Sequence, residues 1–256
     1  MSNNVLIRID QICKSFKADS FTNDVLRNVD FSINEHEFVC ILGHTGCGKS
    51  TLMRIIAGFE MPDSGIVTLE RKEHTGPDRD IIMIFQDYNQ LYPWKTALGN
   101  IVFALRESDA CRNKKEAESI GRRLLKEVGL EKFEAYYPHQ LSGGMRQRVA
   151  VARALALNPK ALIMDEPFSS LDEITRRKLQ GLCREIFEQH NTSIIFVTHS
   201  VEEAISVSDR ILIMNQDGGE IMADLKNVCR EMSDNLTRRD FREEILSYLL
   251  QEEKRK

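Results

Sequence analysis

The sequence lacks long hydrophobic runs, and this sets a first limit on what the chain does. Its longest apolar runs hold four or five residues, such as IIMIF at 81–85, whereas a membrane-spanning helix needs about 20. The opening MSNNVLIRIDQ also lacks the basic-then-apolar pattern of a signal peptide. We therefore expect a chain that does not cross a bilayer, although it remains able to bind a partner that does.

Paired cysteines and a large excess of one charge are also missing. The six cysteines form no CxxC pair and keep no regular spacing, which favours free thiols in a reducing compartment over a disulfide framework or a zinc site. The formal net charge is −4, so the chain as a whole has no electrostatic attraction to nucleic acid. Its 256 residues suffice for one or two domains with a sizeable core.

What the sequence does contain is a series of short, β-rich apolar runs, at 38–42, 66–69, 81–85, 161–164, 193–197 and 211–214. Continuous runs of this kind are typical of strands buried on both faces. Helical patterns alternate with the later runs: one apolar stripe spans Leu179 to Phe187, and Ser200 with Glu203 forms a capping box. Alternating strands and helices predict an α/β fold with a largely parallel sheet.

The middle and the end of the chain have helical patterns. Residues 87–157 contain no comparable strand, and helices are expected at 116–130 and 143–157, which indicates a helical insert. The last segment has one apolar helical face, formed by Phe241, Ile245, Leu246 and Leu249. This favours a terminal helix packed on the body over a helix lying on a membrane.

The run GHTGCGKST at 43–51 follows the strand at 38–42 and precedes an apolar helical segment. This is the context that the phosphate-binding pattern G-x-x-x-x-G-K-[ST] requires. Glycines let the backbone wrap a phosphate, the helix start adds positive potential, and Lys49 brings a full charge to the β- and γ-phosphates. Ser50 is suited to Mg²⁺. We assign the whole loop to nucleotide binding: Gly43, His44, Thr45, Gly46, Cys47, Gly48, Lys49, Ser50 and Thr51.

Two carboxylates end the run at 161–164. Because ligands bind at the carboxyl edge of a parallel sheet, we expect Asp165 to hold the Mg²⁺ shell, mostly through water. Glu166 lies one residue further and points differently, which places it to polarise an attacking water as a general base. By itself the pair fits a charged loop equally well, but beside a phosphate loop it is a standard partner.

Two strand ends add polar groups to this site. His199 follows the run at 193–197, whose strand we expect beside the Asp165 strand, so its ring would reach the γ-phosphate as a donor; a simple loop or capping role is the alternative. Gln86 ends the run at 81–85 and can contact Mg²⁺ or the attacking water while its backbone leads into the helical insert.

Phe16 is the candidate for contact with the base. Its ring would stack on adenine, a contact worth about 1–3 kcal/mol. A core position for Phe16 is the alternative, and Phe21 is the competing aromatic residue.

In this order, the motifs resemble those of ATP-binding-cassette (ABC) ATPases. The set consists of the phosphate loop, Gln86, LSGGMRQR at 141–148, ALIMDEP at 161–167, SSLD at 169–172 and His199. LSGGMRQR is its most specific element, and the resemblance covers the chain to about residue 225. It implies a P-loop NTPase (RecA-like) fold of the α/β class, with a parallel-sheet core, an antiparallel β portion and an inserted α-helical subdomain.

The resemblance also implies a domain organisation and an activity. Residues 1–225 would form the ABC ATPase domain, with a RecA-like core at 1–86 and 158–225, a helical subdomain at 87–157 and a C-terminal helical extension at 226–256. The implied reaction is hydrolysis of ATP to ADP and phosphate with ATP and Mg²⁺ as cofactors. Its catalytic residues would be Glu166, His199 and Gln86, and its metal ligands Ser50, Gln86 and Asp165.

A homodimer with two ATP molecules at its interface is a further implication. In the family, two cassettes pack head to tail, and each LSGG caps the γ-phosphate bound by the other chain. Here Ser142 would supply a hydroxyl, Gly143 and Gly144 their N–H groups, and the following helix its positive end. Gln147 of the same motif, and Asp172 of SSLD across the interface, join the implied nucleotide contacts.

A membrane-embedded partner is implied as well. In the family, the segment after Gln86 forms a groove for a short cytoplasmic helix of a permease. Here the groove would be lined by Tyr88, Leu91, Tyr92, Pro93 and Trp94, with ordinary packing of the insert as the alternative. We expect the chain at the cytoplasmic face of the cell membrane, bound to permease subunits, indirectly to a substrate-binding protein, and to no nucleic acid.

Finer features narrow the resemblance to importers. Residues 76–86, 91–94 and 165–180 look like the cassette subunits of nitrate, sulfonate and taurine importers, with importers of thiamine-pyrimidine precursors as close relatives. Two departures are SSLD in place of GALD, and His36 where the family often has glycine before a glutamate; histidine tolerates an irregular turn. The rival hypothesis, a soluble ABC ATPase acting in DNA repair or translation, predicts a long coiled coil or a second cassette, and this sequence has neither.

Overall fold

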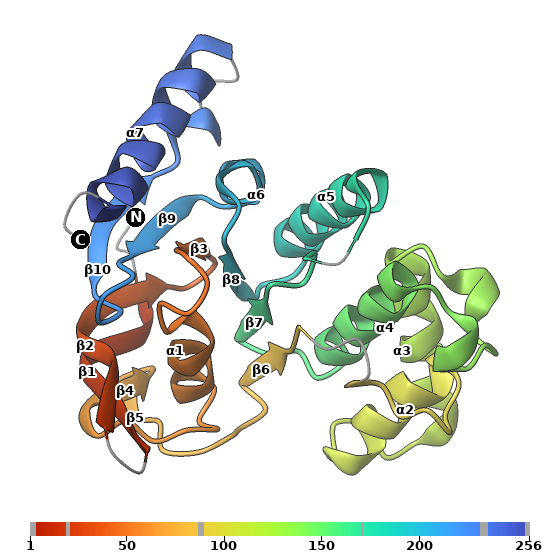
Figure 1. The fold of residues 1–256 in the computed structure, drawn as a ribbon. Coiled ribbons are helices and arrows are strands. Elements are labelled where there is room, and N and C mark those ends of the chain that lie inside the picture. The colour runs from red at the N-terminus through yellow and green to blue at the C-terminus, as the bar shows by residue number, and fades with distance from the viewer. Residues whose placement is uncertain (1–3, 19–20, 87–89, 170, 231–234, 254–256) are drawn as a thin grey trace. The chain divides into compact units, whose positions relative to one another are not determined.

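The computed structural model of the protein describes residues 4–18, 21–86, 90–169, 171–230 and 235–253. The chain divides into two compact units, residues 1–78 with 191–256 and residues 79–190 (Figure 1). The second unit includes two strands besides the helical insert. Its bounds therefore differ from the expected helical subdomain at 87–157, and that domain division stays a prediction.

The first unit contains an antiparallel sheet with the strand order β2-β1-β4-β5. These strands are β1 (Val5–Ala18), β2 (Phe21–Asn34), β4 (Ser64–Leu69) and β5 (Lys72–Glu73). In β1, Ile7 and Ile9 are buried, and a register shift with Gln11 at φ 50° brings Ile12 into the core as well. Because apolar and polar residues alternate in such half-buried strands, β1 and β2 do not show up as apolar runs.

A second group of strands in this unit is mostly parallel. β3 (Phe38–Leu42) pairs in parallel with β8 (Ser193–Thr198) and β9 (Arg210–Met214), and β10 (Ile221–Lys226) pairs antiparallel with β9. Every residue of β3 and β8 is buried, as their unbroken apolar runs predict. The short helices α1 (Lys49–Ile56) and α6 (Val201–Val207) follow β3 and β8 respectively.

The second unit combines one parallel strand pair with helices. The pair is β6 (Ile81–Ile84) and β7 (Ala161–Asp165). The helices are α2 (Ala97–Glu107), α3 (Lys114–Glu127), α4 (Gly143–Leu155) and α5 (Glu173–Gln189), with short 3-10 turns η2 (Glu131–Phe133) and η3 (Pro138–Gln140). Each α-helix begins after a residue whose side chain accepts a backbone N–H: Thr96, Asn113, Ser142 and Asp172. The helices predicted at 116–130 and 143–157 are confirmed within three residues.

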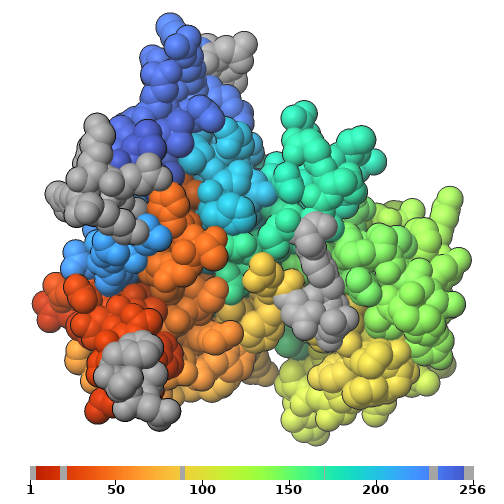
Figure 2. Space-filling view, viewed as in Figure 1, coloured from red at the N-terminus to blue at the C-terminus, as the bar shows by residue number. Residues whose placement is uncertain are grey.

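The C-terminal helix α7 (Asn235–Glu253) follows the 3-10 turn η4 (Val228–Arg230) in the first unit. Its predicted apolar face is buried at Phe241, Ile245 and Leu249, where α7 contacts α6 and β9. In Figure 2 the dark blue atoms of this helix lie against the lighter blue atoms of these elements. The prediction of a terminal helix packed on the body is therefore confirmed. None of the helices in the described ranges combines the length and apolarity needed to cross a membrane.

All six cysteines are free thiols, as their irregular spacing indicates. Four of them are buried, and burial raises the pKa of Cys183 to about 12 because the interior disfavours the thiolate. These cysteines therefore act as small apolar core residues.

Candidate nucleotide-binding site

The loop between β3 and α1 has the strand–loop–helix context that its motif requires. Gly46 and Gly48 adopt φ of 87° and 100°, a region that favours glycine. A Cβ on Gly48 would lie 2.8 Å from the carbonyl oxygen of Val25, whereas a Cβ on Gly46 would meet nothing within 4 Å. Gly48 thus allows close packing on β2, while Gly46 leaves open space beside the loop where an anion can approach.

Lys49 lies folded over its own loop. Its ammonium group donates hydrogen bonds to the carbonyl oxygens of Gly43 and His44, at 2.8 and 2.7 Å, and only 5% of the residue is exposed. Two polar partners offset part of the cost of burying this charge. Because α1 has no acidic residue in its first turn, the ammonium and the helix start present positive potential at the same place.

His199 and the phosphate loop leave neighbouring strands at the same edge. Leu42 of β3 lies opposite Thr198 of β8 in a parallel ladder, so Gly43 and His199 are the next residues on adjacent strands. His199 is exposed and precedes Ser200, which caps α6 by accepting the N–H of Glu203. The predicted capping box is thus confirmed on its serine side, and the residue that caps α6 is Ser200. Asp165 belongs to the second unit, and the expected proximity of His199 to it stays a prediction.

Phe16 lies on β1 with 44% of its surface exposed, which contradicts the alternative of a core position. The ammonium of Lys14 lies 5.3 Å from its ring centroid, so one side of the ring already holds a cation. The ring is available for stacking on a base. The side chain of the competing Phe21 lies outside the described part of the structure.

In the second unit, Glu166 has an unusual backbone. It directly follows the last residue of β7, Asp165, and adopts φ 42°, a left-handed conformation that costs a non-glycine residue about 1–2 kcal/mol. Such strain is concentrated at functional sites, where the surroundings hold it in place. Sequence reasoning identified the carboxylate but not this strain.

Ser169 connects Gln86 to the backbone of Glu166. The hydroxyl of Ser169 donates to the Glu166 carbonyl oxygen at 3.1 Å, and Nε2 of Gln86 donates to the same hydroxyl at 3.3 Å. Sequence reasoning placed Gln86 near the carboxylates but assigned no role to Ser169, which appeared only as the first residue of SSLD. The next residue of that motif, Ser170, lies outside the described residues.

The two glycines of LSGG have different surroundings. Ser142 is exposed and caps α4, because its Oγ accepts the N–H of Met145 at 3.3 Å; the hydroxyl proton remains available as a donor. A Cβ on Gly143 would meet nothing closer than 3.9 Å. A Cβ on Gly144 would lie 2.7 Å from Cγ2 of Thr175 on α5. Gly144 therefore also leaves room for the close approach of α5, and the contact of both backbone N–H groups with an anion stays a prediction.

Two further residues that are predicted to contact nucleotide lie in the second unit, one of them buried and the other exposed. Gln147 is 1% exposed, and its amide has no hydrogen-bond partner among the described residues; its contact with nucleotide stays a prediction. Asp172 is exposed and caps α5, accepting the N–H of Thr175 at 3.0 Å. This backbone hydrogen bond, the largest cause, and a side-chain bond to Thr175 lower the pKa of Asp172, so it stays ionised.

The segment after Gln86 carries an aromatic cluster. Tyr92 packs edge-on against Phe103, with centroids 4.9 Å apart, and lies 5.6 Å from Trp94. Trp94 is 70% exposed and Leu91 is buried, while Tyr88 lies outside the described residues. This surface is apolar at its centre and open to solvent at Trp94.

The residues of the predicted site fit ATP and Mg²⁺ by their chemistry. The open space beside Gly46, the Lys49 ammonium and the uncapped start of α1 suit phosphate. Ser50, Gln86 and Asp165 offer hydroxyl, amide and carboxylate oxygens, the donors that Mg²⁺ accepts while keeping several waters. In the described ranges no three His, Cys, Asp or Glu side chains form a metal-binding cluster.

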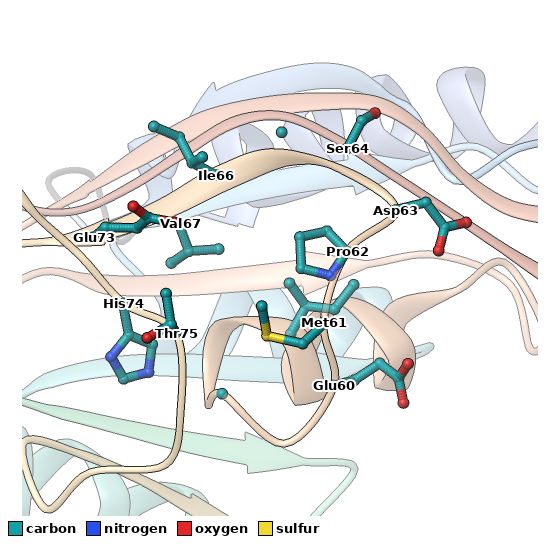
Figure 3. A pocket seen from close by; sticks show the side chains of 13 residues that line it. Glu60, Met61, Pro62, Asp63, Ser64, Ile66, Val67, Glu73, His74 and Thr75 are labelled. Carbon is teal, nitrogen blue, oxygen red and sulfur yellow. The ribbon is translucent and has the colours of Figure 1, made fainter.

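A separate cavity of about 130 Å³ lies in the first unit, beside β4 (Figure 3). Its lining includes Glu60, Met61, Asp63, Ile66, His74 and Thr75. None of the predicted site residues lines it. We therefore assign it no part in nucleotide binding.

Comparison with protein families gives a match to the ABC transporter family over residues 26–169. The chain is 40% identical to an aliphatic sulfonates import ATP-binding protein of Bacillus thuringiensis, over 86% of each chain. It is 39% identical to a bicarbonate transport ATP-binding protein of Synechocystis, over 84% of this chain and 78% of the relative. A nitrate import ATP-binding protein of Synechococcus elongatus is 38% identical over 83% and 77%.

Solved structures agree with these relatives. A dimeric ATP-binding cassette in a post-hydrolysis state, bound to ADP and Pi, superposes with a TM-score of 0.77 at 33% identity. The match covers 87% of this chain and 99% of that cassette. The similarity therefore extends over the fold and the sequence together.

Proposed function

The chain belongs to the ABC transporter family and is an ATP-binding, ATP-hydrolysing subunit, and we propose that it drives an importer of small anions as a homodimer beneath a transmembrane permease. The match to the cassette family over more than half of the chain supports this reading against a soluble ATPase of DNA repair or translation. The P-loop NTPase fold of the α/β class follows from the same relatives.

In this proposal, the phosphate loop holds the triphosphate. Backbone N–H groups around Gly46 and the start of α1 bind phosphate oxygens, and Lys49 exchanges a carbonyl partner for the β- and γ-phosphates. His44, Thr45 and Cys47 complete the loop backbone, and Thr51 lies at the start of α1. Phe16 stacks on adenine. The strongest support is the open side of Gly46, where an added Cβ would meet no atom within 4 Å.

Hydrolysis of ATP needs a general base, a metal ion and a hydrogen-bond donor to the γ-phosphate. Mg²⁺ neutralises developing phosphate charge when bound, and Ser50, Gln86 and Asp165 are its proposed ligands. Glu166 orients and deprotonates the attacking water, and its strained backbone supports a functional role. His199 donates to the γ-phosphate, which the shared strand edge of His199 and Gly43 supports.

The second copy of the chain would complete each site. Ser142 has a free hydroxyl proton, Gly143 has an open Cβ side, and both lie at the positive start of α4. These features support contact with the γ-phosphate held by the partner chain. Because only a closed pair touches ATP from both sides, binding energy would favour dimer closure and hydrolysis would release it.

The proposed class of transported substrate is inferred from the names of the relatives. The sulfonate, bicarbonate and nitrate proteins are named for small anions, and the aromatic cluster around Tyr92 and Trp94 supplies a surface for a permease helix. We place the subunit at the cytoplasmic face of the membrane, with a substrate-binding protein as an indirect partner. The ATPase residues themselves never contact the cargo.

Reconstitution tests this proposal. The tagged chain would be purified from native membranes in mild detergent, its co-purifying permease identified, and the complex reconstituted in liposomes with its binding protein. We expect ATP hydrolysis to rise on addition of one of nitrate, bicarbonate or a sulfonate, and not with a neutral sugar or an amino-acid cation. Stimulation by the sugar alone would contradict the anion assignment, and the absence of any permease would contradict the transport role.

A further inference from the structure

The side chain of Gln90 bonds both backbone groups of Phe85, the residue before Gln86. The amide of Gln90 accepts the N–H of Phe85 at 3.4 Å and donates to the Phe85 carbonyl oxygen at 3.3 Å. Residues 87–89 lie outside the described part of the chain. Gln90 is thus linked to Phe85 through both backbone groups of Phe85, and Gln86 is the next residue along the chain. A displacement of Gln90 therefore reaches Gln86.

Arg153, which lies on α4, contacts both Gln90 and Tyr92. Its guanidinium donates to the carbonyl oxygen of Gln90 at 2.9 Å and lies 5.6 Å from the ring centroid of Tyr92. Burial lowers the pKa of Arg153 while Tyr92 opposes this shift; arginine nevertheless stays charged in proteins. A charged donor to a carbonyl and a cation over a ring make two directional contacts with one segment.

The far end of the segment is fixed by α2. Asn100, which is 0% exposed, accepts the N–H of Tyr92 at 2.8 Å and donates to its carbonyl oxygen at 3.2 Å. The Tyr92 ring in turn contacts Phe103 and lies near Trp94. The aromatic surface therefore has two anchors, one on α2 and one on α4.

The helix α4 links Arg153 to Ser142, the residue that precedes its first turn. Ser142 caps its start and Arg153 lies in its last turn, about 16 Å apart at 1.5 Å per residue. A continuous helix moves as a rigid element over this distance. A ligand that shifts the Ser142 end therefore shifts Arg153, and through it Gln90 and Tyr92.

We propose that Arg153 is a positioning residue that couples the Ser142 end of α4 to the Gln86 segment and the Tyr92–Trp94 surface. The inference rests on the proposed function, since it takes nucleotide to be the ligand at Ser142. It adds a residue for which sequence reasoning assigned no role. If Arg153 only stabilised the fold, its substitution would lower the stability of the protein but would leave the Ser142 end of α4 coupled to the Tyr92–Trp94 surface.

The test compares Arg153→Gln with Arg148→Gln. Arg148 lies on the same helix and donates to the carbonyl oxygen of Val128 at 3.3 Å, so its substitution removes a similar bond away from the segment. Trp94 is the only tryptophan of the chain, and its emission reports on the aromatic surface. The measurements on the full chain are ATP affinity by equilibrium dialysis, Trp94 emission with ATP and Mg²⁺, kcat and KM, and Tm.

We expect a nucleotide-dependent change of Trp94 emission in the wild type and in Arg148→Gln. In Arg153→Gln this change and kcat should fall by at least about threefold, while ATP affinity and KM stay within about twofold. Arg153→Lys keeps the charge but loses the planar contact with Tyr92, so its emission change and kcat should be intermediate. This variant replaces Arg153→Gln in the test if the glutamine variant does not fold.

Three results would overturn the inference: a wild-type emission response in Arg153→Gln, parallel losses in both glutamine variants that follow their Tm, or ATP binding to the wild type without any Trp94 response. Failure of the wild type to bind ATP would instead contradict the proposed function.

Discussion

Gly144 and Thr175 lie so close that a methyl group on the glycine would place its carbon 2.7 Å from Cγ2 of the threonine. The first turns of α4 and α5 therefore approach each other at a point where a Cβ at position 144 would force a shift. The neighbouring Gly143 has no such contact. The two adjacent glycines of this motif therefore differ in their packing, and substituting each of them in turn distinguishes their roles.

Gly144→Ala should destabilise the protein by about 1–3 kcal/mol, because α4 and α5 must move apart. Gly143→Ala should change stability by no more than about 0.5 kcal/mol. Thr175→Ser removes Cγ2 but keeps the hydroxyl, so it should restore most of the stability lost in Gly144→Ala. Urea unfolding of the three single variants and of the double variant Gly144→Ala/Thr175→Ser measures this, and equal losses at the two glycines would contradict the packing argument.

Glu166→Gln should bind ATP but hydrolyse it about 10²–10⁴ times more slowly, because the proposed general base is lost. An ATP-bound dimer should then accumulate. Size-exclusion chromatography with ATP and Mg²⁺ detects it, with the exposed helix carboxylate Glu185→Gln as the matched control. A variant that holds nucleotide yet elutes as a monomer would count against closure of two chains around ATP.

Ser142→Arg should lower ATP hydrolysis by at least about 100-fold, because a large side chain blocks the start of α4. ATP binding to the isolated chain should remain, since the phosphate loop is untouched. Dialysis of dilute monomer against labelled ATP measures binding, and phosphate release measures hydrolysis. Loss of binding by the monomer would mean that Ser142 acts on the nucleotide of its own chain.

Phe16→Ala should raise the Kd for ATP by about 5- to 150-fold, the equivalent of losing about 1–3 kcal/mol of stacking. Inorganic triphosphate has no base, so its affinity should not change. Competition of each ligand with labelled ATP gives both values. If triphosphate affinity falls as well, Phe16 supports the loop rather than contacting adenine.

Arg242 on α7 pairs with Glu202 on α6 at 2.7 Å, and this hydrogen bond lowers the pKa of Glu202 below its usual 4.5. The contribution of this pair to the free energy of unfolding is therefore present above pH 4.5 and is lost as the pH falls through the lowered pKa of Glu202. After allowance for solvent screening, Arg242→Gln should cost about 0.5 kcal/mol at pH 7 and almost nothing near pH 3.

Urea unfolding at the two pH values measures this difference. Arg239→Gln is the matched control, since its pair with Glu243 lies within α7 and both partners are highly exposed. A cost of Arg242→Gln that does not depend on pH would show that the residue acts by packing instead of charge.

Much of the fold and of the site could be predicted because it is encoded locally. Unbroken apolar runs mark fully buried strands such as β3 and β8, and a glycine-rich loop between strand and helix marks a phosphate site. The caps Ser142 and Ser200 are also local, since each acts on a backbone N–H three residues away. The strands β1 and β2 escaped this reasoning because their apolar residues alternate with polar ones.

Local sequence therefore determined the family, the phosphate-loop motif, the position of the proposed catalytic carboxylate and most helix starts. Tertiary structure alone decided which residues far apart in the chain meet: Gly144 on Thr175, Arg153 on Gln90, and Arg242 on Glu202. It also decided that Gln147 faces the interior and that Phe16 does not. The physical reason is that a side chain's exposure and partners depend on the elements packed around it, and residue type and spacing along one chain do not specify these.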